Sequence, residues 1–173
     1  KALWAAHQWP AEVFGGRDTV QLPPFRFGAP EAQHTVSSDH VPRRPLGDHG
    51  AAAASTVQVL LHPDNTGNGA AVLSLLEMAP GLEIPRHRHS SAELLLILSG
   101  HGRAQGRPVR AGDAVYVAAG VAHDLENDGA APMAAVQLYA PAGPERRFLG
   151  QTDPGTQPVP DAERGTGAIV RVA

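Results

Sequence analysis

The chain has 173 residues, a formal net charge of −3 and no cysteine. The length favours one domain with extensions, and the weak negative charge argues against binding to nucleic acid or to an anionic membrane. The lack of cysteine excludes a disulfide framework and a thiolate metal site. No apolar run approaches the length of a transmembrane helix, so we expect a soluble protein. Its compartment stays open, because a chain that begins at Lys1 suits a cytoplasmic protein and a processed secreted or periplasmic one alike.

Residues 1–55 are expected to form an N-terminal arm. Proline recurs in this segment without a clear hydrophobic period, which is unfavourable for an independently folded unit. Trp4, Trp9 and Phe14 are available to pin such an arm to a folded domain. The alanine run Ala51–Ala54 then connects the arm to the next segment.

Residues 56–141 are expected to form the main domain. Short apolar runs alternate here with turn signals, and no long helical period interrupts them, which is typical of an all-β fold. Gly100, His101 and Gly102 are expected to lie in a turn. The expected core strands are Thr56–Leu61, Ala70–Met78, Ile84–His89, Ala92–Leu98, Val109–Arg110, Ala114–Val117, His123–Glu126 and Met133–Ala140.

A first motif with metal-binding residues runs from Gly81 to Gly100. Side chains alternate along a strand with a period of two, so His87 and His89 face the same point. Two serines then form a turn, and the next strand sends Glu93 back toward that point. The motif therefore predicts two imidazoles and one carboxylate at one site.

The strand that carries Glu93 is apolar on both faces. Its inward face continues from Glu93 to Leu95 and Ile97, and its outward face carries Leu94, Leu96 and Leu98. A strand of this kind needs cover on both faces. We expect the outward face to lie under a second sheet, under an arm or against a partner subunit.

A second motif runs from Gly112 through Gly120 and His123 to Asn127. The glycines mark turns, and His123 opens the next short strand, so it is the candidate for a fourth ligand. Three imidazoles and one carboxylate suit iron, manganese, nickel, copper or zinc without selecting among them. On an octahedral ion these four ligands leave two positions for water, oxygen or substrate. The alternative is a site without metal, in which the same residues form a polar core or act as acid–base groups.

These two stretches resemble the motifs of the cupin superfamily. The first family motif reads Gly, five residues, His-x-His, three or four residues, Glu, six residues, Gly, and the chain matches every position. The second reads Gly, five residues, Pro-x-Gly, two residues, His, three residues, Asn, and it departs only where Ala118 replaces proline. The resemblance implies an all-β, cupin-type antiparallel β-barrel, or jelly roll. It also implies metal ligation by His87, His89, Glu93 and His123, and a homodimer in which arms are exchanged. An arm that packs on its own barrel is the alternative to exchange.

Residues 142–173 are expected to form a C-terminal tail rich in proline and glycine, with one strand-like run at Ala168–Val172. Arg146 and Arg147 suit either of two roles. They meet an anionic ligand at the mouth of the barrel, or they lie in a solvated turn that Phe148 anchors.

The leading hypothesis for function is a metal-dependent enzyme that acts on a small molecule. Its chemistry would be oxygen-dependent cleavage of an enol or diketone, isomerisation or decarboxylation, with Glu93 as a ligand or, on detaching, as a general base. Leu95, Ile97 and Leu125 are expected to line the pocket. The alternative is a non-catalytic protein that binds a metal or a small ligand. The sequence shows no DNA-reading helix pair or basic stripe, and it names neither the metal nor the substrate.

Overall fold

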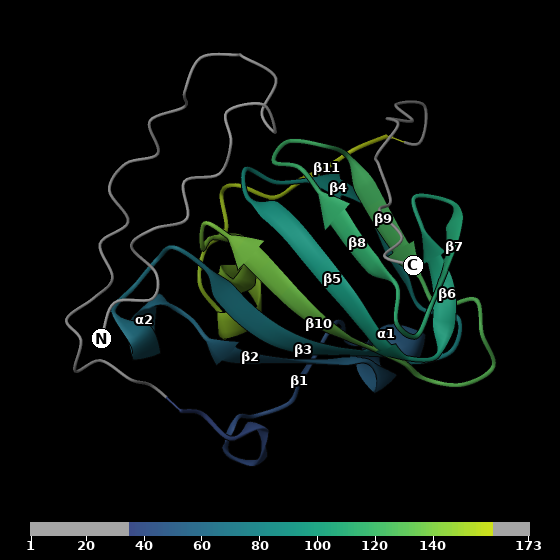
Figure 1. Cartoon of the computed structure of the whole chain (residues 1–173), viewed down its shortest axis with the longest axis horizontal. Helices are drawn as coiled ribbons and strands as arrows, with labels where there is room; N and C mark the ends of the chain where they lie inside the picture. The colour runs from purple at the N-terminus through teal and green to yellow at the C-terminus, as the bar shows by residue number, and fades with distance from the viewer. Residues whose placement is uncertain (1–34, 161–173) are drawn as a thin grey trace, which may run out of the picture.

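Antiparallel strands make up most of the structure, a computed structural model that describes residues 35–160 of the chain (Figure 1). The strands are β1 (Arg44–Pro45), β2 (Thr56–Leu61), β3 (Val72–Met78), β4 (Glu83–Arg88), β5 (Ala92–Ser99), β6 (His101–Ala104), β7 (Arg107–Arg110), β8 (Ala114–Val117), β9 (His123–Glu126), β10 (Met133–Ala140) and β11 (Gln157–Pro158). The helical elements are η2 (Ser38–His40), α1 (Gly50–Ala54), α2 (Pro63–Thr66) and η3 (Pro144–Leu149). Within residues 35–160, no helix is both long and apolar enough to cross a membrane.

The strands form two sheets that face each other as a sandwich (Figure 1). One sheet has six strands in the order β1-β2-β3-β10-β5-β8, and the other has five in the order β11-β4-β9-β6-β7. Each strand pair is antiparallel. This is the expected jelly-roll architecture, with two separate ladders in place of one closed barrel.

The expected core strands are present, and their ends lie within two residues of the expected positions. The expectation of a turn at His101 and Gly102 was wrong, because these residues begin strand β6. β6 lies so close to β9 that a side chain at Gly102 would overlap the backbone carbonyl of Glu126. Glycine is therefore required here by the close approach of two backbones and does not mark a turn.

Alternation along the strands fills the space between the two sheets. In β5, Glu93, Leu95 and Ile97 are buried, whereas the residues between them are exposed. The inward side chains join one apolar cluster that includes Leu76, Met78, Val115, Val117, Leu125 and Met133. Burial of aliphatic side chains of this size contributes about 1.5–3 kcal/mol each. The core therefore supports a rigid framework around the polar residues at one end of it.

Both extensions add strands to the sheets as far as they are described. β1 pairs with β2 at one edge of the six-stranded sheet, and β11 pairs with β4 at an edge of the other. In addition, Phe148 and Leu149 of η3 pack against a second apolar cluster that contains Tyr139. The anchors expected at Trp4, Trp9 and Phe14, and the strand-like run Ala168–Val172, lie outside the described residues.

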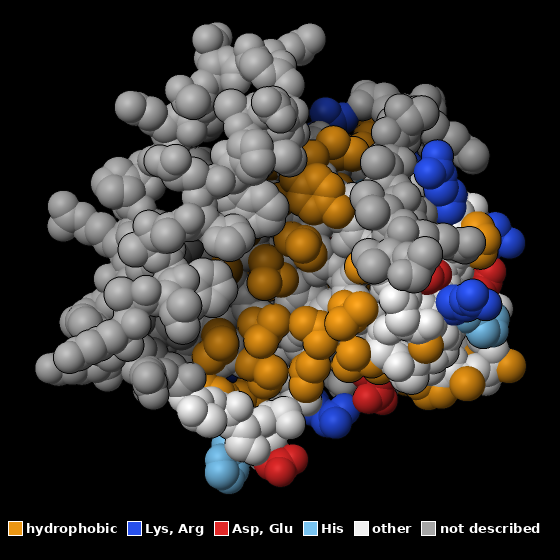
Figure 2. Space-filling view, viewed as in Figure 1, with side chains coloured by type: hydrophobic (Ala, Val, Ile, Leu, Met, Phe, Trp, Pro, Cys, Tyr) orange, Lys and Arg blue, Asp and Glu red, His pale blue; other side chains and the backbone are white. Residues whose placement is uncertain are grey.

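The outward face of the six-stranded sheet is apolar. Leu94, Leu96 and Leu98 keep 43%, 44% and 50% of their surface exposed, and Tyr116 on β8 keeps 46%. Register places Leu96 beside Val136 of β10, which extends the same face. Figure 2, in the view of Figure 1, shows apolar side chains gathered over these strands.

Candidate metal centre

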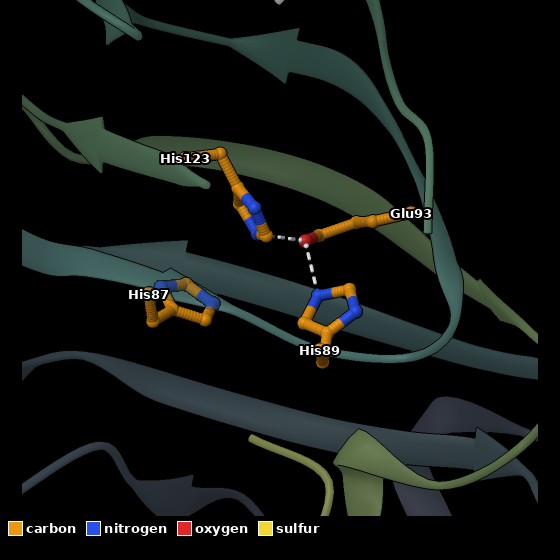
Figure 3. Close-up of side chains that lie close together, drawn as sticks. All are labelled: His87, His89, Glu93 and His123. Carbon is orange, nitrogen blue, oxygen red and sulfur yellow. Dashed lines mark hydrogen bonds and ion pairs between the residues drawn. The ribbon is translucent and has the colours of Figure 1, made fainter. Parts of the chain in front are cut away.

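The structure brings His87, His89, Glu93 and His123 together at one end of the sandwich. One potential ligand atom from each residue lies within 4.8 Å of the corresponding atoms of the others. Figure 3 shows the side chains pointing toward one another, with the Glu93 carboxylate beside the rings of His89 and His123. The four residues are buried, with exposed fractions between 2% and 8%.

Strand register explains the convergence. His87 is the penultimate residue of β4 and pairs directly with His123, which begins β9. His89 lies in the turn between β4 and β5, and Glu93 comes from β5 in the opposite sheet. The site therefore draws on both sheets and on the turn that joins them.

The backbone fixes the ring nitrogen that each histidine presents. Nδ1 of His87, His89 and His123 lies 2.9, 2.8 and 2.8 Å from the backbone carbonyl oxygens of Pro85, Ser91 and Val121, respectively. A carbonyl oxygen only accepts, so each Nδ1 carries the hydrogen and donates it. Each neutral ring then presents the lone pair of Nε2 to the centre, an arrangement typical of histidines that bind metal.

Glu93 is held as a carboxylate by its neighbours. Its Oε2 lies 3.2 Å from Nε2 of His89 and 2.8 Å from Nε2 of His123, and its Oε1 accepts a 2.7 Å hydrogen bond from Nε2 of Gln137. Burial alone would raise the pKa of Glu93, but the hydrogen bonds that it accepts from His123 and His89 when these rings carry a second proton on Nε2, and from Gln137, hold that pKa well below its ordinary value. Glu93 is therefore ionised throughout the physiological range.

The pKa values of His87 and His123 are shifted in opposite directions. Burial and the charge on His123 lower the pKa of His87 from 6.5 to about 4. Burial also disfavours the charged form of His123, but the hydrogen bond and charge of Glu93 outweigh it and raise the pKa of His123 above 6.5. The ionised Glu93 thus favours a positive charge between its carboxylate and the imidazoles.

The donor set fits a divalent metal ion. Nε2 of His87 is buried without a hydrogen-bond partner. Three imidazole lone pairs and a carboxylate aimed at one point would repel each other without a cation. Nitrogen and oxygen donors of this kind suit the first-row divalent ions.

Asn127 holds together the backbone segments next to the site by side-chain hydrogen bonds. Its side chain donates to the backbone oxygens of Met78 and Ala131 at 2.8 and 3.0 Å and accepts from the backbone N–H of Gly129 at 3.0 Å. These bonds tie the end of β9 to β3 and to the following turn. Ala118 stands where the family motif has proline, but the loop before His123 is still bonded to the turn after β4. The backbone N–H of Gly120 donates to the backbone oxygen of His89 at 2.8 Å.

A small cavity of about 20 Å³ adjoins the cluster, which is room for about one water molecule. As expected, Leu95 and Leu125 line it, whereas Ile97 lies deeper in the core and does not. Its remaining apolar lining comes from Ile84, Ala104, Val115 and Val117. The polar residues on its wall include Gln105, Gln137 and Arg147.

Comparison with known proteins agrees with this geometry. A family model described as a cupin domain matches residues 74–139. The tetracenomycin polyketide synthase protein TcmJ of Streptomyces glaucescens is 33% identical over 111 residues, which cover 61% of this chain and 72% of that protein. The chain belongs to the cupin superfamily. The oxalate-binding protein of Thermotoga maritima is a further relative of this cupin, 28% identical over 54% of the chain and 81% of that protein.

Solved structures share the fold of this cupin. The polyketide cyclase RemF from Streptomyces resistomycificus aligns with a TM-score of 0.57 and 19% identity, over 76% of this chain and 89% of that chain. A predicted oxalate decarboxylase from Thermotoga maritima aligns with a TM-score of 0.53 and 23% identity, over 63% of this chain and all of that chain. These identities are low, so the two likenesses establish the fold alone.

Sequence reasoning missed three residues of the site. Gln137 and Tyr139 face inward on β10, where alternation places them beside Glu93. A glutamine on the inward face of an apolar strand was a usable signal for Gln137. Gln105 was missed because β6, which leads to it, was taken for a turn.

Proposed function

We propose that this cupin is a divalent-metal-dependent enzyme that acts on a small molecule with a 1,3-dicarbonyl or enol group, as in the ring closure of a polyketide. The cluster of His87, His89, Glu93 and His123 beside an apolar-lined cavity carries this proposal. The relative named as a polyketide synthase protein, TcmJ, supports the substrate class.

Each group of residues around the site would have a separate role in such a reaction. A divalent ion held by the three Nε2 atoms and by Glu93 would supply Lewis acidity toward the two oxygens of such a group. The backbone carbonyls that accept from Nδ1 keep the imidazoles in the ligating tautomer. The aliphatic lining excludes water, which strengthens electrostatic interactions within the cavity.

Glu93 is better suited to ligation than to proton abstraction. Its lowered pKa and its hydrogen bond from Gln137 stabilise the carboxylate where it lies. A general base works best when its pKa is near the operating pH, and Glu93 is far from that condition. We therefore propose Glu93 as a fixed ligand and leave the role of detached base as the less favoured alternative.

Metal analysis and turnover together test this function. Purified protein should hold about one divalent ion per chain, and Glu93→Gln should lose it, because the amide is a much weaker ligand than the carboxylate. Glu83→Gln is the matched control, since Glu83 is an exposed residue of β4. The loaded protein should convert 1,3-diketones, enols or phenols faster than free metal does. Turnover no faster than free metal would refute the enzyme function.

A non-catalytic binder of a small dicarboxylate is the second candidate. The observation that favours it is the size of the cavity beside the cluster, about 20 Å³, which leaves little room for a large substrate close to the ligand atoms. A relative named as an oxalate-binding protein agrees with this reading. Oxalate bound by the metal-loaded protein and recovered unchanged, with no turnover of dicarbonyl compounds, would favour this candidate.

We also propose that a second copy of the chain covers the apolar outer face of the six-stranded sheet. The exposed residues at its centre, Leu94, Leu96, Leu98 and Tyr116, are uncharged. An uncharged apolar patch is complementary to itself, as a two-fold symmetric interface requires. Exposed apolar surface of this kind marks an interaction site in soluble proteins.

A further inference from the structure

Arg147 occupies the boundary between the small cavity and a larger groove. It lies on η3, after the last strand of the six-stranded sheet, and it lines both spaces together with Ile84. The groove has a volume of about 710 Å³, within the range of small-molecule sites. A ligand that reaches the cluster from this groove would pass the guanidinium of Arg147.

The guanidinium is positioned but not neutralised. Its Cζ lies 4.6 Å from the ring centroid of Phe148, and its Nη2 lies 3.4 Å from the hydroxyl oxygen of Tyr139. Its Nε is buried and has no hydrogen-bond partner. None of the ion pairs among the described residues includes Arg147. The buried Nε–H of Arg147 therefore carries an energetic cost unless a ligand accepts its hydrogen bond.

Other unpartnered polar atoms lie on the same cavity wall. Both side-chain polar atoms of Gln105 and Oε1 of Gln137 are buried without hydrogen bonds. Gln105 also has a φ of 52°, a left-handed conformation that is unfavourable for residues other than glycine. Strained residues and unsatisfied polar groups commonly gather at ligand sites.

The charge of Arg147 reaches the metal-binding cluster. It acts electrostatically on the rings of His87 and His123. With a divalent ion held by the cluster, an anion bound between Arg147 and that ion would interact with positive charge on two sides. A neutral ligand of the same shape would be bound by the metal ion but would not form an ion pair with Arg147.

We propose that Arg147 is a specificity-determining residue that binds an oxyanion, a carboxylate or an enolate, on the dicarbonyl molecule at the metal centre. The inference rests on the proposed function and adds a requirement for negative charge on the substrate. The planar guanidinium offers two parallel N–H donors to such a group. Gln105 supplies a further donor for a neighbouring oxygen of the same ligand.

A matched pair of ligands tests this requirement. Salicylate has a phenol and a carboxylate arranged like the enol of a 1,3-dicarbonyl compound, and salicylamide keeps the arrangement without the carboxylate. Their Kd values would be measured by calorimetry on protein loaded with Co²⁺, whose visible absorption reports the bound ion. Arg147→Gln should weaken salicylate binding by about tenfold or more and leave salicylamide nearly unchanged. Arg147→Lys should retain part of the preference for salicylate over salicylamide, because lysine keeps the positive charge but lacks the two parallel N–H donors of the guanidinium.

Arg146→Gln is the control, because Arg146 is an exposed neighbour on the same helix. It should bind both compounds as the wild type does. Equal binding of salicylate by wild type and Arg147→Gln, or equal weakening of both compounds, would overturn the role of Arg147 while the metal centre stands. Loaded wild type that binds neither compound would overturn it as well. Wild type that takes up no Co²⁺ would instead overturn the proposed metal centre, and this inference with it.

Discussion

The buried state of His87 predicts a specific pH dependence of stability in the metal-free protein. Its pKa is about 4 in the folded chain against 6.5 for the free side chain, so the unfolded chain takes up the proton first as the pH falls. Stability contributed by neutral His87 is therefore present above pH 6.5 and is lost toward pH 4. At about 1.4 kcal/mol per pH unit, the loss by pH 5 is about 2 kcal/mol.

His87→Gln isolates this contribution, because His123 has a raised pKa and acts in the opposite direction over the same range. Urea denaturation with a chelator present, at pH 7 and pH 5, gives the free energy of unfolding of each protein. The wild type should lose about 2 kcal/mol more than His87→Gln between these values. His40→Gln, at an exposed histidine, should behave as the wild type. Parallel pH dependence in wild type and His87→Gln would refute the buried neutral state.

Four further outcomes are expected. Asn127→Ala should lower the free energy of unfolding by about 2–3 kcal/mol in urea denaturation, because it removes the three hydrogen bonds of a buried side chain. Gly102→Ala should prevent stable folding, as judged by circular dichroism, because the new Cβ overlaps the carbonyl of Glu126, whereas Gly69→Ala meets no atom and should fold normally. Leu96→Glu should convert a dimer into a monomer in light scattering, and a monomeric wild type would contradict the interface. Bound metal should be released steeply on acidification, because protons compete for the imidazoles, and metal content unchanged at pH 4 would contradict ligation by histidine.

The strands and the cluster were predictable because both depend on local rules. Alternation with a period of two determines which side chains of β5 face inward, and the short turn after His89 limits where Glu93 can return. His123 follows from the same reasoning once β9 is recognised as the strand that pairs with β4, where His123 lies opposite His87. Local pattern failed at β6, where Gly102 reflects contact with another strand.

The sequence did not decide between the two roles expected for Arg147. Its two proposed roles differ only in how η3 folds back against the sheet, and that depends on contacts of Phe148 and Leu149 with a distant cluster around Val57 and Tyr139. Two adjacent arginines gave no local signal that one is exposed and the other lines a cavity. Long-range packing, rather than periodicity, decides such cases.

The location of Arg147 along the chain has an evolutionary consequence. The candidate metal-binding cluster lies wholly within the stretch that matches the cupin family model, residues 74–139, whereas Arg147 lies in the segment that follows it. Reactivity and substrate choice would thus be encoded in separate parts of the gene. Mutations in the short C-terminal segment would then be free to redirect the protein toward ligands of different charge while the inherited metal chemistry stays intact. A library confined to residues 144–150 is therefore an economical starting point for altering its selectivity.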